Sequence, residues 1–546
     1  SNSSHSFYSS SDSDISGYGI GLARRASSRT TITASKEETA HELAAQVASR
    51  IKSRFSKNLP QALVEDYDNR DCVAPFQTTE IVIGPLLGSG EFSHVYEIKS
   101  FQPDVSLEEN LSHEEVETRQ HMKRRERYHD TKKACYAVKH LRPTLLEKYS
   151  KLEYAQSASD LANEAEFLAS LQHPNIIKLR GISFLGAGGF ANGPKGYFLI
   201  IDRLNETLEM RIKRWKNNKR RRNRLASSFK TKIENKKLLL AHHAHGGGRK
   251  DSKELVEGNN KEHHDKCKLL IGEEQVDVGL QISSALMYLH EKSIMFRDLK
   301  PQNIGFDVRG DVKLFDFGLA TVMPIFGDPY ENKFDMSGAG SPRYMAPEVL
   351  IDPPEKYNLK ADVYGFGIVL WQIFSLEVPF AHIKRRDELV EFVINQEGRP
   401  TINENWPEPI KEVLHLSFDT DIGQRPSIQL FYNMLRFQLL NMRDGDDTKL
   451  SDAFIRRRRS NGSMKNLKVN DDEEDVDRQN QSNEKFPQRM KNTIMSHVKS
   501  PPSSSNADDH HAPPRRRRAA NKLRDKFRLS IKQEEKSVVS KAHSSF

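Results

Sequence analysis

The sequence predicts an α+β fold in which a small, strand-rich lobe precedes a larger, mainly helical lobe, with long disordered tails. Strand-like runs are concentrated in residues 79–201, and helical periodicity dominates residues 274–443 without an internal repeat. Strands followed by helices favour two unlike lobes over a doubly wound sheet. Hydrophobic residues make up 36% of the 546 residues, against about 45–50% in ordinary globular chains. We therefore expect one globular unit of roughly 250–300 residues, diluted by polar segments that cannot fold alone.

The composition also excludes several classes of protein. Lys and Arg number 84 against 75 Asp and Glu, so the net charge is a modest +9. The three cysteines, Cys72, Cys135 and Cys267, are too scattered for a disulfide framework and favour a reducing, cytoplasmic location. The longest apolar stretch, residues 366–374, is too short to span a bilayer. A secreted, transmembrane or collagen-like protein is not expected.

The first 78 residues are predicted to be disordered apart from one amphipathic helix near residues 36–56. Residues 1–34 are rich in Ser and have no hydrophobic period. Ser35-Lys36-Glu37-Glu38 has the pattern of a capping box. Apolar side chains then recur every four residues, at Leu43, Val47, Ile51 and Phe55. We expect this helix to dock on the folded domain; the alternative is a helix that binds a membrane or a partner through its basic end.

A glycine-rich segment lies between two predicted strands, Ile81–Gly84 and His94–Ile98. It is made of Gly88, Ser89, Gly90, Glu91, Phe92, Ser93, His94 and Val95. Glycines let a backbone approach phosphate oxygens closely, and Val95 would lie against a purine. The segment lacks the Gly-Lys-Ser/Thr ending of a P-loop. Taken alone, it is equally well interpreted as a plain hairpin turn.

Lys139 follows Ala137 and Val138 in an apolar strand after this hairpin. An unpaired ammonium group would be costly there, so Lys139 requires an anionic partner. Glu164, on the next predicted helix, is the candidate for that partner.

The strongest motif is Arg297-Asp298-Leu299-Lys300-Pro301-Gln302-Asn303, followed by Asp316-Phe317-Gly318 after a short strand. These residue types suit transfer of a phosphoryl group between oxygens. Asp298 would orient the attacking hydroxyl, and Lys300 would neutralise the transferring charge. Asn303 and Asp316 supply the hard oxygen ligands that hold Mg²⁺ on phosphates.

Together these motifs resemble the eukaryotic protein kinase superfamily. The resemblance covers residues 79–440 apart from two insertions, and it includes Ala346-Pro347-Glu348, the stretch 362–367 and Arg425-Pro426 in the same order. It implies a bilobal kinase fold, with an N-lobe at 79–201 and a C-lobe at 202–443, and ATP and Mg²⁺ as cofactors. In its sequence pattern, the chain is most similar to the tyrosine-kinase-like group.

The resemblance also implies roles for residues outside the phosphoryl-transfer motif. Glu348 would pair with Arg425, and Asp362 would hold the backbone of the catalytic loop. Ile201 would be the gatekeeper, with Asp202 and Leu204 offering backbone groups to adenine.

Two departures from the family pattern are Phe296 and Ser93. Phe296 stands where the family usually has His, and Ser93 replaces the third glycine of the glycine-rich loop. Because Phe keeps the packing of that His, we expect activity to survive. The packed column would contain Leu168, Leu179, Phe296 and Phe317.

Lys300 and Ser341 indicate which hydroxyl is phosphorylated. By resemblance, a lysine two residues after the catalytic aspartate, bridged by a Ser or Thr in the substrate loop, is typical of the serine/threonine branch. We therefore expect a protein serine/threonine kinase of intracellular signalling. One alternative is a pseudokinase scaffold that binds partners without turnover. Another is a nucleic-acid or membrane adaptor whose basic tails carry the main function.

Arg297, beside Asp298, predicts regulation by phosphorylation. An arginine in this position is commonly neutralised by a phosphate on the activation loop, and Ser337 is the best-placed acceptor. The alternative is that Arg297 simply binds backbone carbonyls.

Two insertions and a basic tail complete the chain. Residues 101–132 are mostly charged and are expected to form a surface excursion, either a solvated helix or a loop. Residues 213–268 are rich in Lys and Arg and are predicted to be largely disordered; they either influence access to the cleft or form an inert loop. Their His and Cys residues do not have a metal-ligand spacing.

The tail, residues 444–546, is predicted to be disordered and carries the blocks Arg456–Arg459 and Arg515–Arg518. These blocks would bind acidic partners or nuclear-import receptors, which makes a nuclear location the second expectation. Protein substrates with Ser or Thr are the expected partners, and nucleic acid is not expected as the main ligand.

Overall fold

The computed structural model describes residues 38–57, 63, 71–129, 131–243, 271–324 and 327–444. The predictions of disorder for residues 1–34, for the second half of the 213–268 insertion and for the tail after residue 444 fall outside these residues. None of the helices described here is both long and apolar enough to cross a membrane.

The N-lobe is built on a six-stranded sheet with the order β1-β5-β6-β4-β3-β2. Its strands are β1 (Ala74–Phe76), β2 (Ile81–Ser89), β3 (Ser93–Phe101), β4 (Tyr136–Leu141), β5 (Leu179–Ser183) and β6 (Phe198–Asp202). β1 pairs in parallel with β5, and the other pairs are antiparallel. The lobe therefore begins before residue 79, the predicted boundary. A three-residue strand is too short to show a hydrophobic period.

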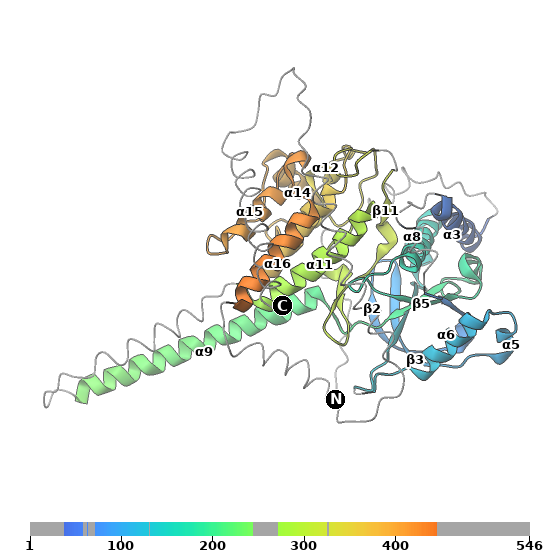
Figure 1. Ribbon diagram of the computed structural model, residues 1–546, viewed down its shortest axis with the longest axis horizontal. Coiled ribbons are helices and arrows are strands. Elements are labelled where there is room, and N and C mark those ends of the chain that lie inside the picture. The colour runs from blue at the N-terminus through green and yellow to red at the C-terminus, as the bar shows by residue number, and fades with distance from the viewer. Residues whose placement is uncertain are drawn as a thin grey trace, which may run out of the picture. The chain divides into compact units, whose positions relative to one another are not determined.

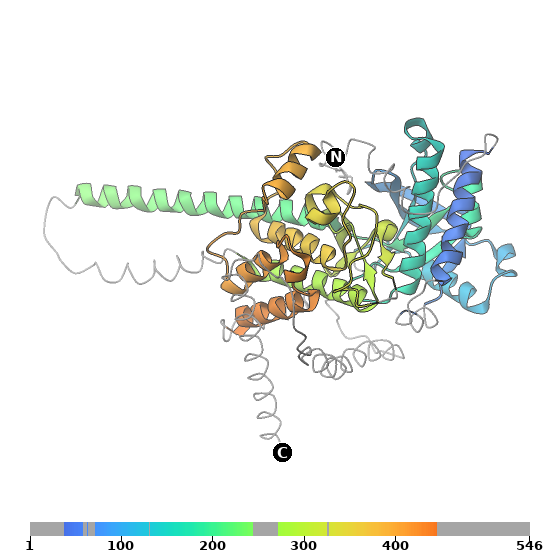
Figure 2. The ribbon, with the colours of Figure 1, turned by 90° about the horizontal axis from the view of Figure 1, so that it is seen from above.

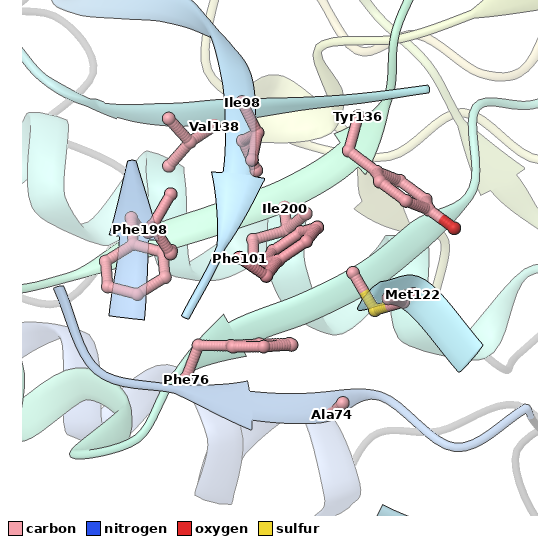
Figure 3. Close-up of a cluster of buried hydrophobic side chains, with 10 residues drawn as sticks. Ala74, Phe76, Ile98, Phe101, Met122, Tyr136, Val138, Phe198 and Ile200 are labelled. Atoms are coloured by element: carbon pink, nitrogen blue, oxygen red, sulfur yellow. The ribbon is translucent and has the colours of Figure 1, made fainter. Parts of the chain in front are cut away.

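One face of this sheet carries an apolar cluster (Figure 3). Phe76 of β1 and Phe101 of β3 pack with their ring centroids 5.1 Å apart, and Tyr136 of β4 packs edge-on against Phe101. Met122 reaches the cluster from the 101–132 insertion. Alternation along the strands places these side chains on one face.

The 101–132 insertion forms largely exposed helices, as one of the two expectations had it, but two of their side chains, Arg119 and Met122, are buried in this lobe. It forms α5 (Val105–Glu108) and α6 (His113–Arg124). Arg119 of α6 is completely buried, where it pairs with Glu80 and donates to the carbonyl of Pro75 over 3.0 Å. The charged composition did not predict this burial. A buried guanidinium is tolerated only where the tertiary structure supplies its partners, and these cannot be identified from the local sequence.

α8 (Lys151–Ser170) packs beside α3 (Ala40–Lys57), and the two helices lie side by side in both views (Figures 1 and 2). Leu43 and Val47 of α3 pack against Ala155 of α8. The prediction of a docked helix is confirmed. The short helix α7 (Leu145–Lys148) precedes α8.

The capping box predicted at Ser35 lies outside the described residues. The described start of α3 has a capping arrangement at Thr39 and Glu42: the backbone N–H of Thr39 donates to Glu42 Oε2 over 2.9 Å, and that of Glu42 donates to Thr39 Oγ1 over 3.2 Å. Both segments have the same Ser/Thr-x-x-Glu pattern.

The C-lobe is mainly helical, as predicted. Its helices are α9 (Leu208–His243), α11 (Glu273–Glu291), α12 (Pro347–Leu350), α13 (Lys360–Ser375), α14 (Arg386–Val390), α15 (Glu408–Ser417) and α16 (Ile428–Asp444). Short strands β7 (Glu206–Thr207), β9 (Ile304–Phe306) and β10 (Val312–Leu314) form one small sheet, and β8 (Ile294–Met295) pairs with β11 (Thr321–Val322). α13 is buried along almost its whole length, which explains its continuous apolar sequence.

The first half of the 213–268 insertion differs from its prediction. Residues 213–243 continue α9 as helix, although disorder was expected from their charge. The reason is local: residues 208–243 contain neither Gly nor Pro and are rich in Lys, Arg and Leu, which are strong helix formers.

Candidate active site

The glycine-rich segment is a hairpin between β2 and β3, and it faces a cavity between the lobes. Gly90 N donates to the carbonyl of Ser93 over 2.9 Å, so Gly90, Glu91 and Phe92 make the turn. Gly88 and Ser89 pair with Val95 and His94.

The cavity next to this hairpin brings together Val95, which was predicted to lie against a purine, and the expected gatekeeper and adenine-binding residues. It is lined by Leu87, Val95, Ala137, Ile201, Asp202, Leu204, Glu206 and Thr207. Leu87, Glu206 and Thr207 were missed by the sequence analysis. Leu87 directly precedes Gly88, which is the only signal that could have identified it, and Thr207 reaches the cavity through β7, whose pairing is tertiary.

Lys139 is buried between two carboxylates. Its Nζ lies 2.6 Å from Glu164 Oε2 and 3.0 Å from Asp316 Oδ1. Burial lowers the pKa of Lys139, but Asp316 and Glu164 outweigh burial and raise this pKa above its ordinary value. Burial raises the pKa of Glu164 against the opposing effect of Lys139. The predicted partner of Lys139 is therefore in place, and the lysine is held as a cation.

Four polar residues meet around Asp298. Lys300 Nζ lies 2.9 Å from Asp298 Oδ2 and donates to Ser341 Oγ over 3.0 Å. Ser341 Oγ donates to Asp298 Oδ1 over 2.8 Å, and Asn303 Nδ2 donates to Asp298 Oδ2 over 2.9 Å. Ser341 thus bridges the aspartate and the lysine, as the resemblance implied. The arrangement orients a carboxylate for a hydroxyl donor and places a cation beside it.

Asn303 and Asp316 fit the chemistry of a magnesium ion bound through a nucleotide. Asn303 uses its amide nitrogen on Asp298, which leaves its amide oxygen as an acceptor. Asp316 adopts a left-handed backbone (φ 70°, ψ 65°), and its side chain is 43% exposed. Across the described residues, no group of three or more His, Cys, Asp or Glu could hold a metal by itself. Mg²⁺ usually takes one or two carboxylates together with substrate phosphates and water, and Asp316 with Asn303 would supply the protein's share of such ligands.

Asp362 holds the backbone of the catalytic loop. Its carboxylate accepts from the N–H of Phe296 over 2.8 Å and of Arg297 over 2.9 Å. His290 Nε2 lies 3.1 Å from the same carboxylate, a contact that the sequence analysis missed. Arg297 has a positive φ of 72°, a conformation in which the surrounding bonds must hold a non-glycine residue.

The four residues of the predicted packed column are all buried, and the two rings among them are in contact. Phe296 and Phe317 are fully buried, and Leu168 and Leu179 are nearly so. The rings of Phe296 and Phe317 meet edge-on with centroids 5.1 Å apart. Phe296 therefore occupies an apolar site that needs no ring nitrogen.

Asn163 of α8 is a further supporting residue that the sequence analysis missed. Its Nδ2 lies 3.1 Å from each of the carbonyl oxygens of Gly318 and Ala320. Asn163 ties the segment after Asp316 to the helix that carries Glu164. Its position directly before Glu164 is the only available sequence signal.

The substrate side of the C-lobe is braced by Glu348 and Arg425. The guanidinium makes two bonds to the carboxylate, of 2.6 and 2.7 Å, and both side chains are buried. The pair implied by the resemblance is present, and its two parallel bonds fix the orientation of the loop before α12.

Arg297 contacts Ser337 through both the backbone and the side chain of that serine. Arg297 Nη2 donates to the carbonyl of Ser337, to Ser337 Oγ over 3.0 Å and to the hydroxyl of Tyr357 over 3.1 Å. Arg297 therefore binds a backbone carbonyl, as the alternative interpretation of this residue expected. Ser337, the predicted phosphate acceptor, also lies next to its guanidinium.

Comparisons with known proteins agree with this site. Residues 252–436 match the model of the protein kinase domain, a stretch that contains Asp298, Lys300, Asn303 and Asp316. Lys139 and Glu164 lie outside this match, and the fold joins them to it.

Similar proteins include a mitogen-activated protein kinase kinase kinase 7-like protein of Drosophila melanogaster, with 35% identity over 32% of this chain and 44% of that protein. The dual specificity protein kinase shkB of Dictyostelium discoideum is 36% identical over 26% of this chain and 21% of its own. The serine/threonine-protein kinase STY46 of Arabidopsis thaliana is 34% identical over 29% and 26%. The chain thus spans less than half the length of these relatives.

The two-lobed fold, the buried Lys139–Glu164 pair and the matched kinase domain agree with one another. The chain thus contains a protein kinase domain, matched over residues 252–436, and its similarity is to the eukaryotic protein kinase superfamily.

Proposed function

We propose that this chain is an active protein kinase that transfers the γ-phosphoryl group of ATP to serine and threonine hydroxyls of proteins. The observation that carries the proposal is the bonded group of Asp298, Lys300, Asn303 and Ser341. It lies on the same chain as a buried lysine that is already paired with two carboxylates. A protein kinase domain implies ATP, typically with Mg²⁺, and protein substrates.

Each polar residue has a distinct part in this proposal. Asp298 accepts the hydrogen bond of the substrate hydroxyl and then its proton, in the place where it now accepts from Ser341. Lys300 offsets negative charge on the transferring group. Lys139 holds the nucleotide phosphates and is positioned by Glu164. Asn303 and Asp316 would hold Mg²⁺, which offsets phosphate charge when bound.

The contact between Lys300 and Ser341 supports specificity for serine and threonine. By resemblance, a lysine two residues after the catalytic aspartate, bridged by a Ser or Thr, is typical of the serine/threonine branch. One similar protein is named a serine/threonine-protein kinase and another a dual specificity kinase. Specificity is therefore the part of the proposal that needs a direct measurement.

We also assign Ser337 as an acceptor of an activating phosphate. Its Oγ already lies 3.0 Å from Arg297 Nη2, so a phosphate there would gain a charge-assisted bond to the catalytic loop.

The test is phosphorylation of casein and myelin basic protein by the full chain with labelled Mg-ATP, followed by phosphoamino-acid analysis. Phosphoserine and phosphothreonine are expected, and Asp298→Asn is the matched inactive control. Phosphotyrosine as the main product would overturn the specificity. Binding of Mg-ATP without turnover would instead identify a pseudokinase scaffold.

A further inference from the structure

The first turns of α9 are fixed to the catalytic part of the C-lobe. Glu209 Oε1 accepts from the amide of Gln302, a residue of the catalytic loop, over 3.1 Å. Arg211 pairs with Glu274 over 2.8 Å, and its guanidinium lies 3.8 Å from the ring centroid of Phe306. These contacts set the direction in which the helix leaves the loop.

From residue 210 to residue 233, the charged side chains of α9 are all of one sign. Residues 210–233 contain no Asp or Glu; their basic residues are Arg211, Lys213, Arg214, Lys216, Lys219, Arg220, Arg221, Arg222, Arg224, Lys230 and Lys232. Arg211, Lys213 and Arg214 pair with glutamates at the base of the helix. We call Lys219, Arg220, Arg221, Arg222 and Arg224 the basic cluster. All five are exposed, and within the described part of the chain no ion pair involves them. Figures 1 and 2 show α9 as one straight helix.

The basic cluster lacks an intramolecular role in the described residues. Like charges three or four residues apart, such as Arg220 and Arg224, oppose helix formation, so an anionic partner would stabilise this part of α9. Four successive basic residues, 219–222, also point to all sides of a helix with 3.6 residues per turn. A helix that lies on a membrane needs an apolar face, which residues 216–224 lack. The charge therefore suits an extended acidic chain.

We propose that the basic cluster of α9 is a docking site for acidic segments of protein substrates. This inference rests on the proposed function, because it assumes that the ligand of the catalytic loop is a protein. The link between Glu209 and Gln302 fixes the docking site to that loop, so one substrate chain reaches both the cluster and Asp298.

The geometry sets a spacing for such substrates. The basic cluster lies 10–15 residues beyond Glu209, which at 1.5 Å per residue is about 15–22 Å along the helix. An extended peptide covers about 3.3 Å per residue. Counted from Glu209, the stretch of substrate that reaches the basic cluster is therefore about five to seven residues long.

The test uses the full chain and matched peptides. Each peptide carries one acceptor serine, a Gly/Ser spacer of six residues and either five Glu or five Gln, placed before or after the serine. In one of the two orders, we expect the Glu peptide to have a KM lower by on the order of tenfold at low salt, with kcat unchanged. The difference should disappear in high salt. A spacer of one residue should also abolish it.

A charge-neutral variant and a matched control locate the effect. Lys219→Gln together with Arg220→Gln, Arg221→Gln and Arg222→Gln should equalise the KM of the Glu and Gln peptides. Replacement of all four arginines 456–459 by Gln removes as many positive charges from the tail and should keep the difference. Equal KM values for the two peptides with the unchanged protein, or loss of the difference only in the tail variant, would overturn the proposal.

Charge reversal guards against a loss caused by misfolding. With residues 219–222 all replaced by Glu, a peptide ending in five Lys should become the preferred substrate, while the Gln peptide keeps its kinetics. A reversed variant that still prefers the Glu peptide contradicts a docking role for α9.

Binding measured without ATP separates this inference from the proposed function. Fluorescence anisotropy of the labelled Glu peptide should show weaker binding to the neutral α9 variant than to the tail variant. If this holds while no peptide is phosphorylated, the proposed function fails and the docking site stands. If the neutral variant loses affinity for oligouridylate but keeps its preference for the Glu peptide, α9 binds nucleic acid and the docking proposal is overturned.

Discussion

The ring of Phe55 packs edge-on against the ring of Phe167, with centroids 5.1 Å apart and an interplanar angle of 84°. Phe55 belongs to α3, and Phe167 lies one turn after Glu164 on α8. At the other end of the same contact, His41 Nδ1 lies 3.1 Å from the hydroxyl of Tyr154. A segment from before the N-lobe sheet thus packs along the helix that positions Lys139.

Phe55→Ala should weaken both the fold and the active site. Removing a buried Phe costs about 3 kcal/mol of unfolding free energy, measurable by urea denaturation. Because α8 carries Glu164, the KM for ATP should also rise, and Phe55→Leu should restore most of both. Ser53→Ala, on the exposed side of α3, is the control. An unchanged KM in a destabilised Phe55→Ala protein would show that α3 only stabilises the lobe.

Asp298→Ala should lower turnover by on the order of 10³-fold while nucleotide binding stays nearly intact, because Asp298 contacts the hydroxyl side of the site. Turnover at the unchanged rate on a generic substrate would refute the role of Asp298.

Asp316→Ala should act on a different step. It should remove the Mg²⁺ dependence of nucleotide binding, measured by calorimetry with and without Mg²⁺. Mg-ATP affinity equal to that of the unchanged chain would exclude Asp316 as a metal ligand.

Phe296→His should be tolerated, whereas Phe296→Asp should inactivate the protein and destabilise it by several kcal/mol. The site is fully buried, and the described contacts of Phe296 offer no partner for a carboxylate there. Thermal unfolding and kinase assays measure the two effects. A stable and active Asp variant would show that this position is open to water.

His173 should make stability depend on pH. Burial, followed by the charge of Lys313, lowers the pKa of His173 to about 4, from about 6.5 in an unfolded chain. Between these values the unfolded chain binds the proton more strongly. This contribution is therefore fully present above pH 6.5 and falls as the pH drops towards 4.

His173→Gln should flatten the dependence of unfolding free energy on pH in this window, by up to about 3 kcal/mol. Urea denaturation at several pH values measures the slope. The slope is compared, and not the absolute stability, because the substitution also removes the acceptor of the Asn175 N–H and so lowers stability at every pH. His382→Gln, at an exposed site, is the control variant. An equal slope in both variants would contradict the assignment.

Much of the candidate site could be predicted because its residues lie close together in the sequence. Asp298, Lys300 and Asn303 fall within six residues, and a short loop must bring them together. Asn163 and His290 could not be found this way. Their side chains are ordinary helix residues, and their roles arise from contacts with Gly318 and Asp362, 155 and 72 residues away.

The predictions for the two insertions missed structural features for two different reasons. Helix formation in α9 follows from local propensity, which the high charge concealed. Burial of Arg119 in α6 depends on Glu80, 39 residues away in the sequence, so no local pattern predicts it.

By itself, the sequence determined the order of strands and helices, the two-lobed fold class and the residues of the phosphoryl-transfer motif, because period and short motifs are local properties. Only the tertiary structure decided that α3 supports α8, that α6 completes the N-lobe and that Lys139 lies between Glu164 and Asp316. Those outcomes depend on distant groups that become neighbours only when the chain folds. Whether a charged side chain faces the solvent or the core depends on whether folding brings a partner of opposite charge next to it, and residue type alone does not show this.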